Sequence, residues 1–491
     1  MQRLGISDFI WLNIYWLGLS MASASLTPII LPVLVQHFVG GEVKNTFYGA
    51  LRAAGLMVAI LVQPAAGLLS DRSTSPWGRR RPYIFLGTML DLLFLTMVAL
   101  SGNYWLLFFS VALLQFSSNI AHGALQGLIP DLVPHSQRER ASAVKAVTEL
   151  LPVVLTAFTV ARLVDAGHME AAFIVVAGSL LVTMLLTVVF VQEKPLREPP
   201  NLPLAPLMLR ILGLLLGSLI GALAGAICGT LVGGAIGLMA LPFAGRERAL
   251  MVGVGIGGLM AMVTAIIVSV WTSVSISAEA RRYPSFTWWV TNRFLFLAAV
   301  GSLQSFALYF LQDVLCLSNA PHTAGNLMMA VGVLTLLAAL PSGYLADRIG
   351  RKRLVAVAGL AASVGTVLLI LSPDVTWVLI SGCIIGISTG IFFTTNWALG
   401  TELVPPKEAG RYLGISNLAG AGAGIVGAGL GGPLADFFNR RADSLGYLVI
   451  FAIYAACFLI SAVVLQGVRE EPHWKSEIRS QRAEGTLHSA F

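Results

Sequence analysis

Charged residues are scarce in this chain, and long polar stretches are scarcer. Asp, Glu, Lys and Arg make up only 11% of the 491 residues, whereas 56% are hydrophobic. A water-soluble domain carries roughly a quarter charged residues, so the composition excludes an ordinary soluble protein and indicates an integral membrane protein. The longest stretches outside the apolar runs are residues 193–206 and 469–491. Neither could fold into a catalytic domain, and we expect no enzyme.

Cysteine is scarce as well. The four cysteines stand singly within apolar stretches and have neither a metal-binding spacing nor a disulfide pattern. They are Cys228, Cys316, Cys383 and Cys457. Isolated cysteines of this kind pack as small hydrophobic residues. The sequence therefore predicts no metal site and no cofactor.

Hydrophobic runs, by contrast, fill the chain. Fourteen of them are long enough to cross a bilayer, which takes roughly 20 residues each. They lie near residues 9–35, 46–69, 83–101, 104–129, 139–163, 170–191, 209–241, 249–275, 288–311, 324–345, 354–372, 376–400, 411–434 and 446–466.

The net charge of +7 is distributed unevenly around these spans. With the N-terminus inside, 24 of the 31 Lys and Arg residues fall on the cytoplasmic side. Such an excess orients membrane proteins, so we expect both termini in the cytoplasm and a multi-pass protein of the plasma or inner membrane. The same bias accounts for the basic charge without a nucleic-acid partner.

An internal repeat divides the chain. The segment "PAAGLLSDRSTSPWGRRR" (64–81) recurs as "PSGYLADRIGRKR" (341–353), and "DLVPHSQRER" (131–140) recurs as "ELVPPKEAGR" (402–411). Asp131 and Glu402 are 271 residues apart, and the other features of the second pair keep that offset. We therefore predict two related six-helix halves. The predicted parts are residues 1–195, a linker with two inserted helices at 196–283, residues 284–468, and a cytoplasmic tail at 469–491.

The repeated Gly-x-x-x-Asp-Arg, followed by Gly-Arg-Arg/Lys-Arg, resembles a loop motif of the major facilitator superfamily. "SDRSTSPWGRRRPYI" (70–84) and "QFSSNIAHGALQGLIPDL" (115–132) are similar to segments of sucrose-type proton symporters and of glycoside–pentoside–hexuronide cation symporters. Where the plant sucrose carriers have an aspartate and an arginine, this chain has Gln115 and Gln126. The resemblance implies an all-α major facilitator fold, with two six-helix bundles of inverted repeats and, here, two inserted helices.

The resemblance also implies that helices 1, 4, 7 and 10 line a substrate cavity. Polar residues recur on one face of the first and of the fourth predicted span. Such groups either bond between helices or face a wet surface between the bundles, and we favour the second for these two stripes. The candidate cavity residues are Trp16, Ser20, Gln115, Asn119, His122, Gln126, Gln304, Tyr309, Asn396 and Trp397. Neutral amides beside indole rings suit a hydroxyl-rich solute such as a sugar or glycoside.

A cytoplasmic gate is implied at the repeated loops. Its members would be Asp71, Arg72, Arg79, Arg80, Asp131 and Arg140 in the first half, and Asp347, Arg351, Glu402 and Arg411 in the second. Each partly solvated pair would be weak alone and would matter as part of a network. The alternative is that these arginines only set the topology.

Ionisable residues within the spans are candidates for coupling to a cation, here a proton. Glu149 lies deep in the fifth span, one turn after Lys145, and either carries the proton or forms a structural pair. Asp91 in the third span is the rival candidate, although a buried structural role suits that peripheral helix better.

Glycine recurs at every fourth position from Gly213 to Gly237. Such a stripe lets helices approach closely in lipid, and we expect it to pack against the next span, which contains "GVGIGG" (253–258). Because this pair lies outside the repeat, we interpret it as an accessory packing element.

Together these patterns favour a secondary active transporter that moves a small polar solute in symport with a proton. The alternatives are a drug or metabolite exporter, and a protein of this fold that assembles membrane complexes. The expected partners are the solute, the coupling cation and the lipid bilayer. We expect a monomer, with an oligomer formed through the glycine-rich helices as the alternative.

Overall fold

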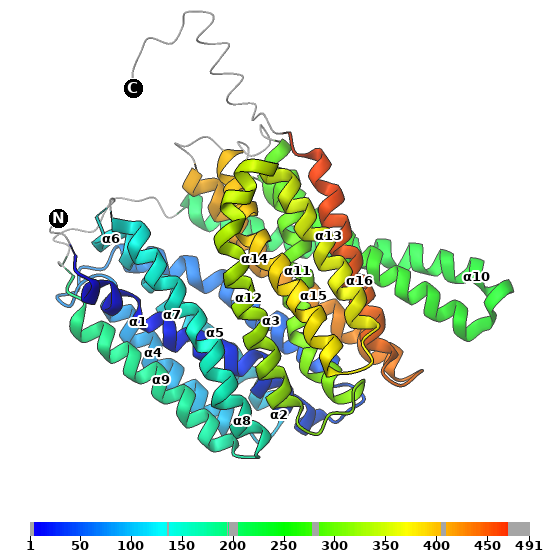
Figure 1. Cartoon of the computed structure of the whole chain (residues 1–491), viewed down its shortest axis with the longest axis horizontal. Helices are drawn as coiled ribbons and strands as arrows, with labels where there is room; N and C mark the ends of the chain where they lie inside the picture. The colour runs from blue at the N-terminus through cyan, green and yellow to red at the C-terminus, as the bar shows by residue number, and fades with distance from the viewer. Residues whose placement is uncertain are drawn as a thin grey trace, which may run out of the picture. The chain divides into compact units, whose positions relative to one another are not determined.

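The computed structural model describes residues 4–134, 137–193, 195, 205–276, 284–403 and 409–469, and the regular structure in these ranges is helical (Figure 1). The first part of the chain forms α1 (Ile6–Ser25), the π-helix η1 (Leu26–Ile30), α2 (Leu31–Val39), α3 (Lys44–Asp71), α4 (Arg81–Ala99), α5 (Tyr104–Leu125), α6 (Leu128–Leu132), α7 (Arg138–Phe158), α8 (Val160–Asp165) and α9 (Met169–Phe190). The remainder forms α10 (Ala205–Ile276), α11 (Pro284–Asp313), α12 (Ala320–Ile349), α13 (Arg351–Ile370), α14 (Val375–Glu402), α15 (Ala409–Asn439), α16 (Leu445–Val464) and the short 3₁₀ helix η5 (Leu465–Gly467).

Twelve helical segments among the described residues are long and apolar enough to cross a membrane. One of them, Leu215–Ser275, extends over 61 residues within α10. The 31-residue α15 is not among the twelve. The all-α character is as predicted, whereas the count of fourteen spans stays a prediction.

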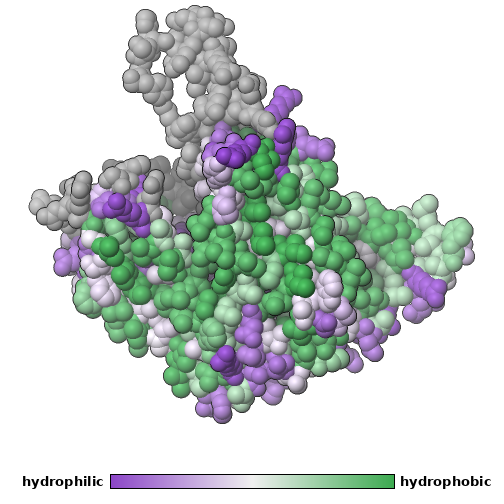
Figure 2. All heavy atoms as spheres, viewed as in Figure 1, coloured by the Kyte–Doolittle hydropathy of each residue, from purple (hydrophilic) through white to green (hydrophobic). Residues whose placement is uncertain are grey.

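The surface agrees with a lipid surrounding. Figure 2 shows large hydrophobic areas on the visible face, with hydrophilic residues gathered mostly at the ends of the helices. Ile174, Val182 and Val189 on α9 are all more than half exposed. Large exposed apolar areas are unusual on proteins in water, but they are expected where a protein surface faces the lipid of a bilayer.

Packing divides the chain into two compact units. The first contains Met1–Leu204, Gln304–Val333 and Gly431–Tyr447, and the second contains Ala205–Leu303, Leu334–Leu430 and Leu448–Phe491. The first unit therefore includes one end each of α11, α12, α15 and α16 together with α1 to α9. The predicted boundaries at residues 195, 283 and 468 stay predictions.

Small residues allow the helices of the first unit to approach closely. A Cβ at Gly87 of α4 would lie 2.9 Å from the carbonyl oxygen of Ser117 on α5. At Gly123 it would lie 3.0 Å from the backbone nitrogen of Gly67 on α3. Such contacts replace the hydrophobic effect as a means of helix association in lipid, and they bring the polar residues of α5 next to α3 and α4.

In the second unit, α10 is a hairpin of two legs that lie side by side (Figure 1). The legs meet at Gly245, whose φ of 75° breaks the helix. A Cβ at Gly221 would lie 2.5 Å from the carbonyl oxygen of Ala265, and one at Gly233 would lie 2.5 Å from that of Gly253. The predicted packing of the glycine stripe against the next span is confirmed, because the legs touch backbone to backbone.

Candidate functional site

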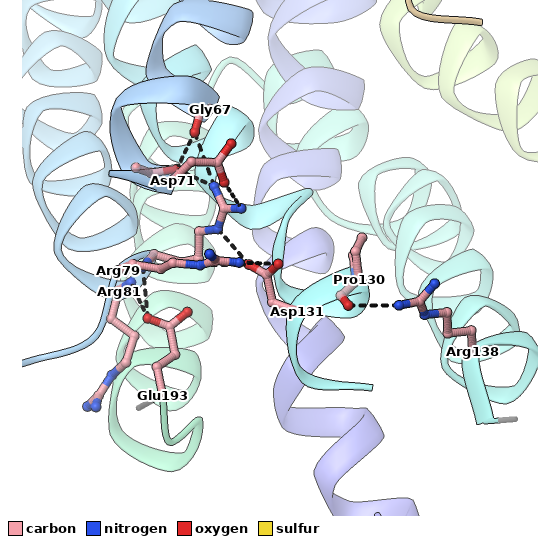
Figure 3. A network of polar contacts seen from close by, with 10 residues as sticks. Gly67, Asp71, Arg79, Arg81, Pro130, Asp131, Arg138 and Glu193 are labelled. Carbon is pink, nitrogen blue, oxygen red and sulfur yellow. Dashed lines mark hydrogen bonds and ion pairs between the residues drawn. The ribbon is translucent and has the colours of Figure 1, made fainter. Parts of the chain in front are cut away.

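The loop between α3 and α4 places Arg80 at the centre of a polar cluster. Figure 3 labels its partners Gly67, Asp71 and Asp131. The Arg80 side chain is 6% exposed, and its Nε donates to Asp131 Oδ2 at 2.9 Å. Its Nη1 donates to the carbonyl oxygen of Gly67 at 3.1 Å, and its Nη2 forms an ion pair with Asp71. Arg79 Nε donates to the same oxygen of Asp131 at 3.1 Å. One buried guanidinium is thus bound by two carboxylates, as a buried charge requires.

Glu193, just beyond α9, completes this cluster and was not predicted. It accepts hydrogen bonds from the backbone N–H of Arg80 at 2.8 Å and of Arg81 at 3.3 Å. No side chain of α4 caps these first N–H groups, so Glu193 caps the helix from outside it. Gly78 has a φ of 102° and leaves no room for a side chain beside Glu193. Burial raises the pKa of Glu193 above its ordinary value of 4.5, although the backbone donors oppose that shift.

The second half repeats the arginine–carboxylate pair. Arg351 Nη1 lies 2.6 Å from Glu402 Oε1, and its Nη2 lies 3.6 Å from Asp347 Oδ1. In the repeated motif, Arg351 follows Gly350 as Arg79 follows Gly78, and Arg79 also contacts Asp131. Both halves therefore contain a contact between a motif arginine and the carboxylate at the 271-residue offset.

Arg72 and Arg140 form no ion pair with the described residues. Arg72 has a buried Nε that makes no hydrogen bond to any described residue. Arg140 is exposed on α7, and it is Arg138 that donates to the carbonyl oxygen of Pro130 at 2.9 Å (Figure 3). The side chain of Arg411 lies outside the described part of the chain.

The predicted stripes of α1 and α5 meet within the first unit. The Trp16 indole packs edge-on against His122, with ring centroids 5.1 Å apart. Lys145 Nζ on α7 lies 4.0 Å from the centroid of the Trp16 ring. His122 Nε2 and Gln126 Nε2 lie 3.2 Å apart. An aromatic face, an imidazole, an amide and an ammonium are thus assembled on three neighbouring helices.

Four further cavity candidates lie outside this group. Asn119 is buried and donates to the side-chain oxygen of Gln115 at 3.3 Å and to its backbone oxygen at 2.7 Å. Ser20 is half-buried on α1. Gln304 is exposed on α11.

The two candidate coupling acids have different surroundings. Glu149 Oε1 lies 3.2 Å from Lys145 Nζ, and the Glu149 side chain is 37% exposed. Because Lys145 also lies over the Trp16 ring, Glu149 is adjacent to the group formed by Trp16, His122 and Gln126. Asp91 is 1% exposed and accepts a hydrogen bond from Ser117, while its Oδ2 has no hydrogen-bond partner among the described residues.

At the start of α3, a second ionic cluster joins residues far apart in the sequence. Lys44 is 2% exposed, and its Nζ lies 2.8 Å from Asp313 Oδ1 at the end of α11. The Tyr447 hydroxyl donates to Asp313 Oδ2 at 2.5 Å. The Lys44 ammonium also lies 4.7 Å from the ring centroid of Tyr309. The sequence suggests neither Lys44 nor Tyr447, because no periodic pattern relates them to Asp313.

Asp436 of α15 caps the N-terminus of α3. Its Oδ2 accepts the backbone N–H of Thr46 at 2.6 Å, and its Oδ1 accepts the Asn45 side chain at 2.8 Å and the Asn45 N–H at 3.3 Å. The residue preceding α3 is Val43, which offers no capping side chain. The distant carboxylate therefore supplies what the local sequence lacks. We call Lys44, Asn45, Asp313, Asp436 and Tyr447 the capping network.

Tyr309, a cavity candidate, belongs to this region. Its hydroxyl donates to the carbonyl oxygen of Pro32 at 2.8 Å. Nearby, the π-turn η1 leaves the Thr27 carbonyl without a helical donor, because Leu31 N–H bonds Leu26 and Pro32 has no N–H. The Tyr48 hydroxyl donates to that carbonyl instead. Thus Tyr48 attaches α3 to the π-turn, and Tyr309 attaches α11 to the start of α2.

The last candidates, Asn396 and Trp397 of α14, surround Arg293 in the second unit. Arg293 is 8% exposed, and its Nη1 donates to Asn396 Oδ1 at 3.2 Å. Its guanidinium lies 5.2 Å from the ring centroid of Trp397. Asn396 in turn donates to Asn292 Oδ1 at 2.8 Å.

Comparison with known proteins gives one family. The model described as "Major Facilitator Superfamily" matches residues 16–318 and 289–488. The human proton-associated sugar transporter A is 28% identical over 224 residues, 38% of this chain and 29% of that protein. The minor myo-inositol transporter IolF of Bacillus subtilis is 26% identical over 157 residues, 32% of this chain and 35% of that protein. The chain matches about a third or less of the length of these curated relatives.

Solved structures agree in fold. The nucleoside transporter NupG matches with a TM-score of 0.64 at 12% identity, over 94% of this chain and all of that chain. The POT family transporter PepTSo matches with a TM-score of 0.66 at 11% identity, over 94% of this chain and 98% of that one. At such low identity, the likeness extends to the fold alone.

Proposed function

Since the chain belongs to the Major Facilitator Superfamily, we propose that it is a secondary transporter that moves a small polar solute across the membrane by alternating access. The family consists of transporters and not of enzymes, in line with the absence of a polar domain in the sequence. The observation that carries the proposal is the cluster of Trp16, His122, Gln126 and Lys145 on membrane-spanning helices. Polar groups cost free energy in a bilayer, and within spans they mark substrate and ion pathways.

The solute that suits this cluster is a sugar or glycoside. An indole offers a flat apolar face to a sugar ring, while amide and imidazole groups bond its hydroxyls. The printed names of the relatives, a sugar transporter and an inositol transporter, support a polyol or sugar.

Alternating access is supported by the two ends of α3. At its start, α3 is joined to Asp313, Asp436 and Tyr447 of the second half of the chain. At its end, the described partner of Asp71 is Arg80 of the first half. We propose that the capping network is the outer gate in its closed state and that Arg80 and Arg351 with their carboxylates form the cytoplasmic gate.

Coupling to protons is proposed at Glu149, with Asp91 as the alternative. Both termini are proposed to lie in the cytoplasm, on the side of the arginine-rich loops, in a plasma or inner membrane.

Transport by purified protein in liposomes tests the proposal. Radiolabelled glucose, sucrose and myo-inositol would be offered with an inward proton gradient, with and without a protonophore. We expect at least one solute to accumulate and the protonophore to abolish accumulation. Extrusion driven by the same gradient would indicate an exporter. No flux of any solute, with a co-purifying membrane protein, would favour the assembly role instead.

A further inference from the structure

A buried arginine in the second unit lacks an acidic partner. Arg293 lies nine residues into α11, about 14 Å along the helix axis from Pro284, and is 8% exposed. Within the described ranges of the chain, no carboxylate forms an ion pair with it, whereas Arg351 of the same unit is met by Glu402 at 2.6 Å. A positive charge held inside a membrane span without a counter-charge is costly.

The groups that hold Arg293 are neutral and fixed. Its Nη1 donates to Asn396 Oδ1, which lies at 3.2 Å. Asn396 is oriented by donating to Asn292 at 2.8 Å, and Asn292 donates to the Ser461 carbonyl at 2.8 Å. Trp397 places its ring 5.2 Å from the guanidinium carbon. This chain of amides and the indole therefore position the guanidinium without neutralising it.

The other edge of the guanidinium has no hydrogen-bond partner among the described residues. Nε is sealed from solvent and makes no hydrogen bond to any residue that the structure describes. Nη2 likewise forms no hydrogen bond with a described residue. Nε and Nη2 form the edge with which arginine binds two oxygens of a carboxylate or phosphate side by side.

We propose that Arg293 is the anion-binding residue of the solute site, so that the transported solute carries an oxyanion, a carboxylate or a phosphate, in addition to hydroxyl groups. The ligand oxyanion supplies the counter-charge that the described residues do not. Trp397 and Asn396 fix the orientation of the guanidinium plane, so that Nε and Nη2 each bind one oxygen of the oxyanion. The inference rests on the proposed transport function and narrows its substrate class to acidic sugars or sugar phosphates.

Thermal unfolding of the purified full-length chain tests the inference. The probes are D-glucuronate, D-glucose 6-phosphate, D-glucose and inorganic phosphate, titrated against the native chain and the variants Arg293→Gln and Arg293→Lys. The control is Arg353→Gln, which removes the same charge from an exposed position on α13.

We expect glucuronate or glucose 6-phosphate to bind the native chain more tightly than glucose. Arg293→Gln should weaken oxyanion binding about 30-fold or more, since it removes one partner of a buried charge pair, and should weaken glucose binding far less. Arg293→Lys should restore only part of the affinity, because lysine has no fork, and Arg353→Gln should behave as the native chain.

Equal binding of the oxyanions by the native chain and Arg293→Gln overturns the inference, as does tighter binding of glucose than of both acidic sugars by the native chain. The second comparison also decides the matter if Arg293→Gln does not fold. Phosphate binding that depends on Arg293, with no sugar bound, would overturn the proposed sugar transport and leave the anion site standing.

Discussion

Individual buried charges in this protein differ in how they are compensated. Lys44 and Arg80 each contact carboxylates, and Arg80 contacts two. Arg293 contacts the Asn396 amide and the Trp397 indole, and no described carboxylate pairs with it. Paired charges such as Lys44 and Arg80 hold helices together, whereas the charge of Arg293 is available to the ligand that we propose. The pairing of a residue, rather than its charge alone, separates structural from binding candidates.

Glu149→Gln tests the coupling residue. We expect the variant to lose gradient-driven accumulation and to retain exchange of labelled for unlabelled solute, because exchange needs no net proton movement. Lys145 would lose its 3.2 Å partner but would keep its position over Trp16. Accumulation with normal protonophore sensitivity in Glu149→Gln would exclude Glu149, and Asp91→Asn would then be measured in the same assay.

Glu193→Gln tests the capping carboxylate through pH. The folded-state pKa of Glu193 is raised, so its contribution to stability is full below the ordinary value of 4.5 and is lost as pH rises through the higher folded value. The native chain should therefore lose this contribution as the pH rises above 4.5, and the glutamine variant should not. The measurement is the difference in Tm between the two proteins from pH 4 to pH 8. A difference that does not change with pH would contradict the assignment.

Among the elements, α10 shows how glycine determines packing in lipid. Glycines facing the other leg leave no room for a side chain, whereas Gly234 has no neighbouring atom within 4 Å. Gly233 and Gly234 are adjacent on the same leg, yet Gly233 contacts the other leg and Gly234 does not. The four-residue spacing of the stripe therefore determines which glycines contact the other leg.

Gly225→Leu and Gly234→Leu form a matched pair on this hairpin. A Cβ at Gly225 would lie 2.8 Å from that of Ala265, so leucine there should force the legs apart and cost about 1–3 kcal/mol, as overpacking does. Gly234→Leu should be close to neutral. Thermal unfolding in detergent measures both, and an equal loss of stability in the two variants would show that the glycine contacts do not hold the hairpin.

For the molecule as a whole, opposite variants should move the transport cycle in opposite directions. Asp436→Asn removes the charge that caps α3, with a loss of about 1–3 kcal/mol from its charged hydrogen bonds, and should favour outward opening. Asp71→Asn weakens a partly exposed pair by about 1 kcal/mol or less and should favour inward opening without unfolding. Cysteine labelling from each side of the membrane measures both shifts. Unchanged labelling in both variants would rule out the two gates.

The sequence predicted what depends on local pattern and missed what depends on distant pairing. Apolar runs predicted the helices, and the repeated loop motif identified Arg80 and Asp131, which the structure joins at 2.9 Å. Glu193 stands alone after a span, so no spacing distinguished it. Asp436 has no local pattern that relates it to α3, because its contact with Asn45 crosses 391 residues. Such partners become evident only when the helix ends are brought together.

The α10 hairpin also provides a site at which a marker domain for electron microscopy can be inserted. Its legs are locked along their length by the glycine contacts, and its second leg is anchored through Trp271 against Trp288 and Met262 against Cys457. The turn at Gly245 lies between the exposed Phe243 and the polar run Arg246–Arg248. A small soluble domain grafted into that turn would be carried on a stiff arm. Electron microscopy of a membrane protein with so little polar mass would thereby gain an alignment marker that leaves both proposed gates untouched.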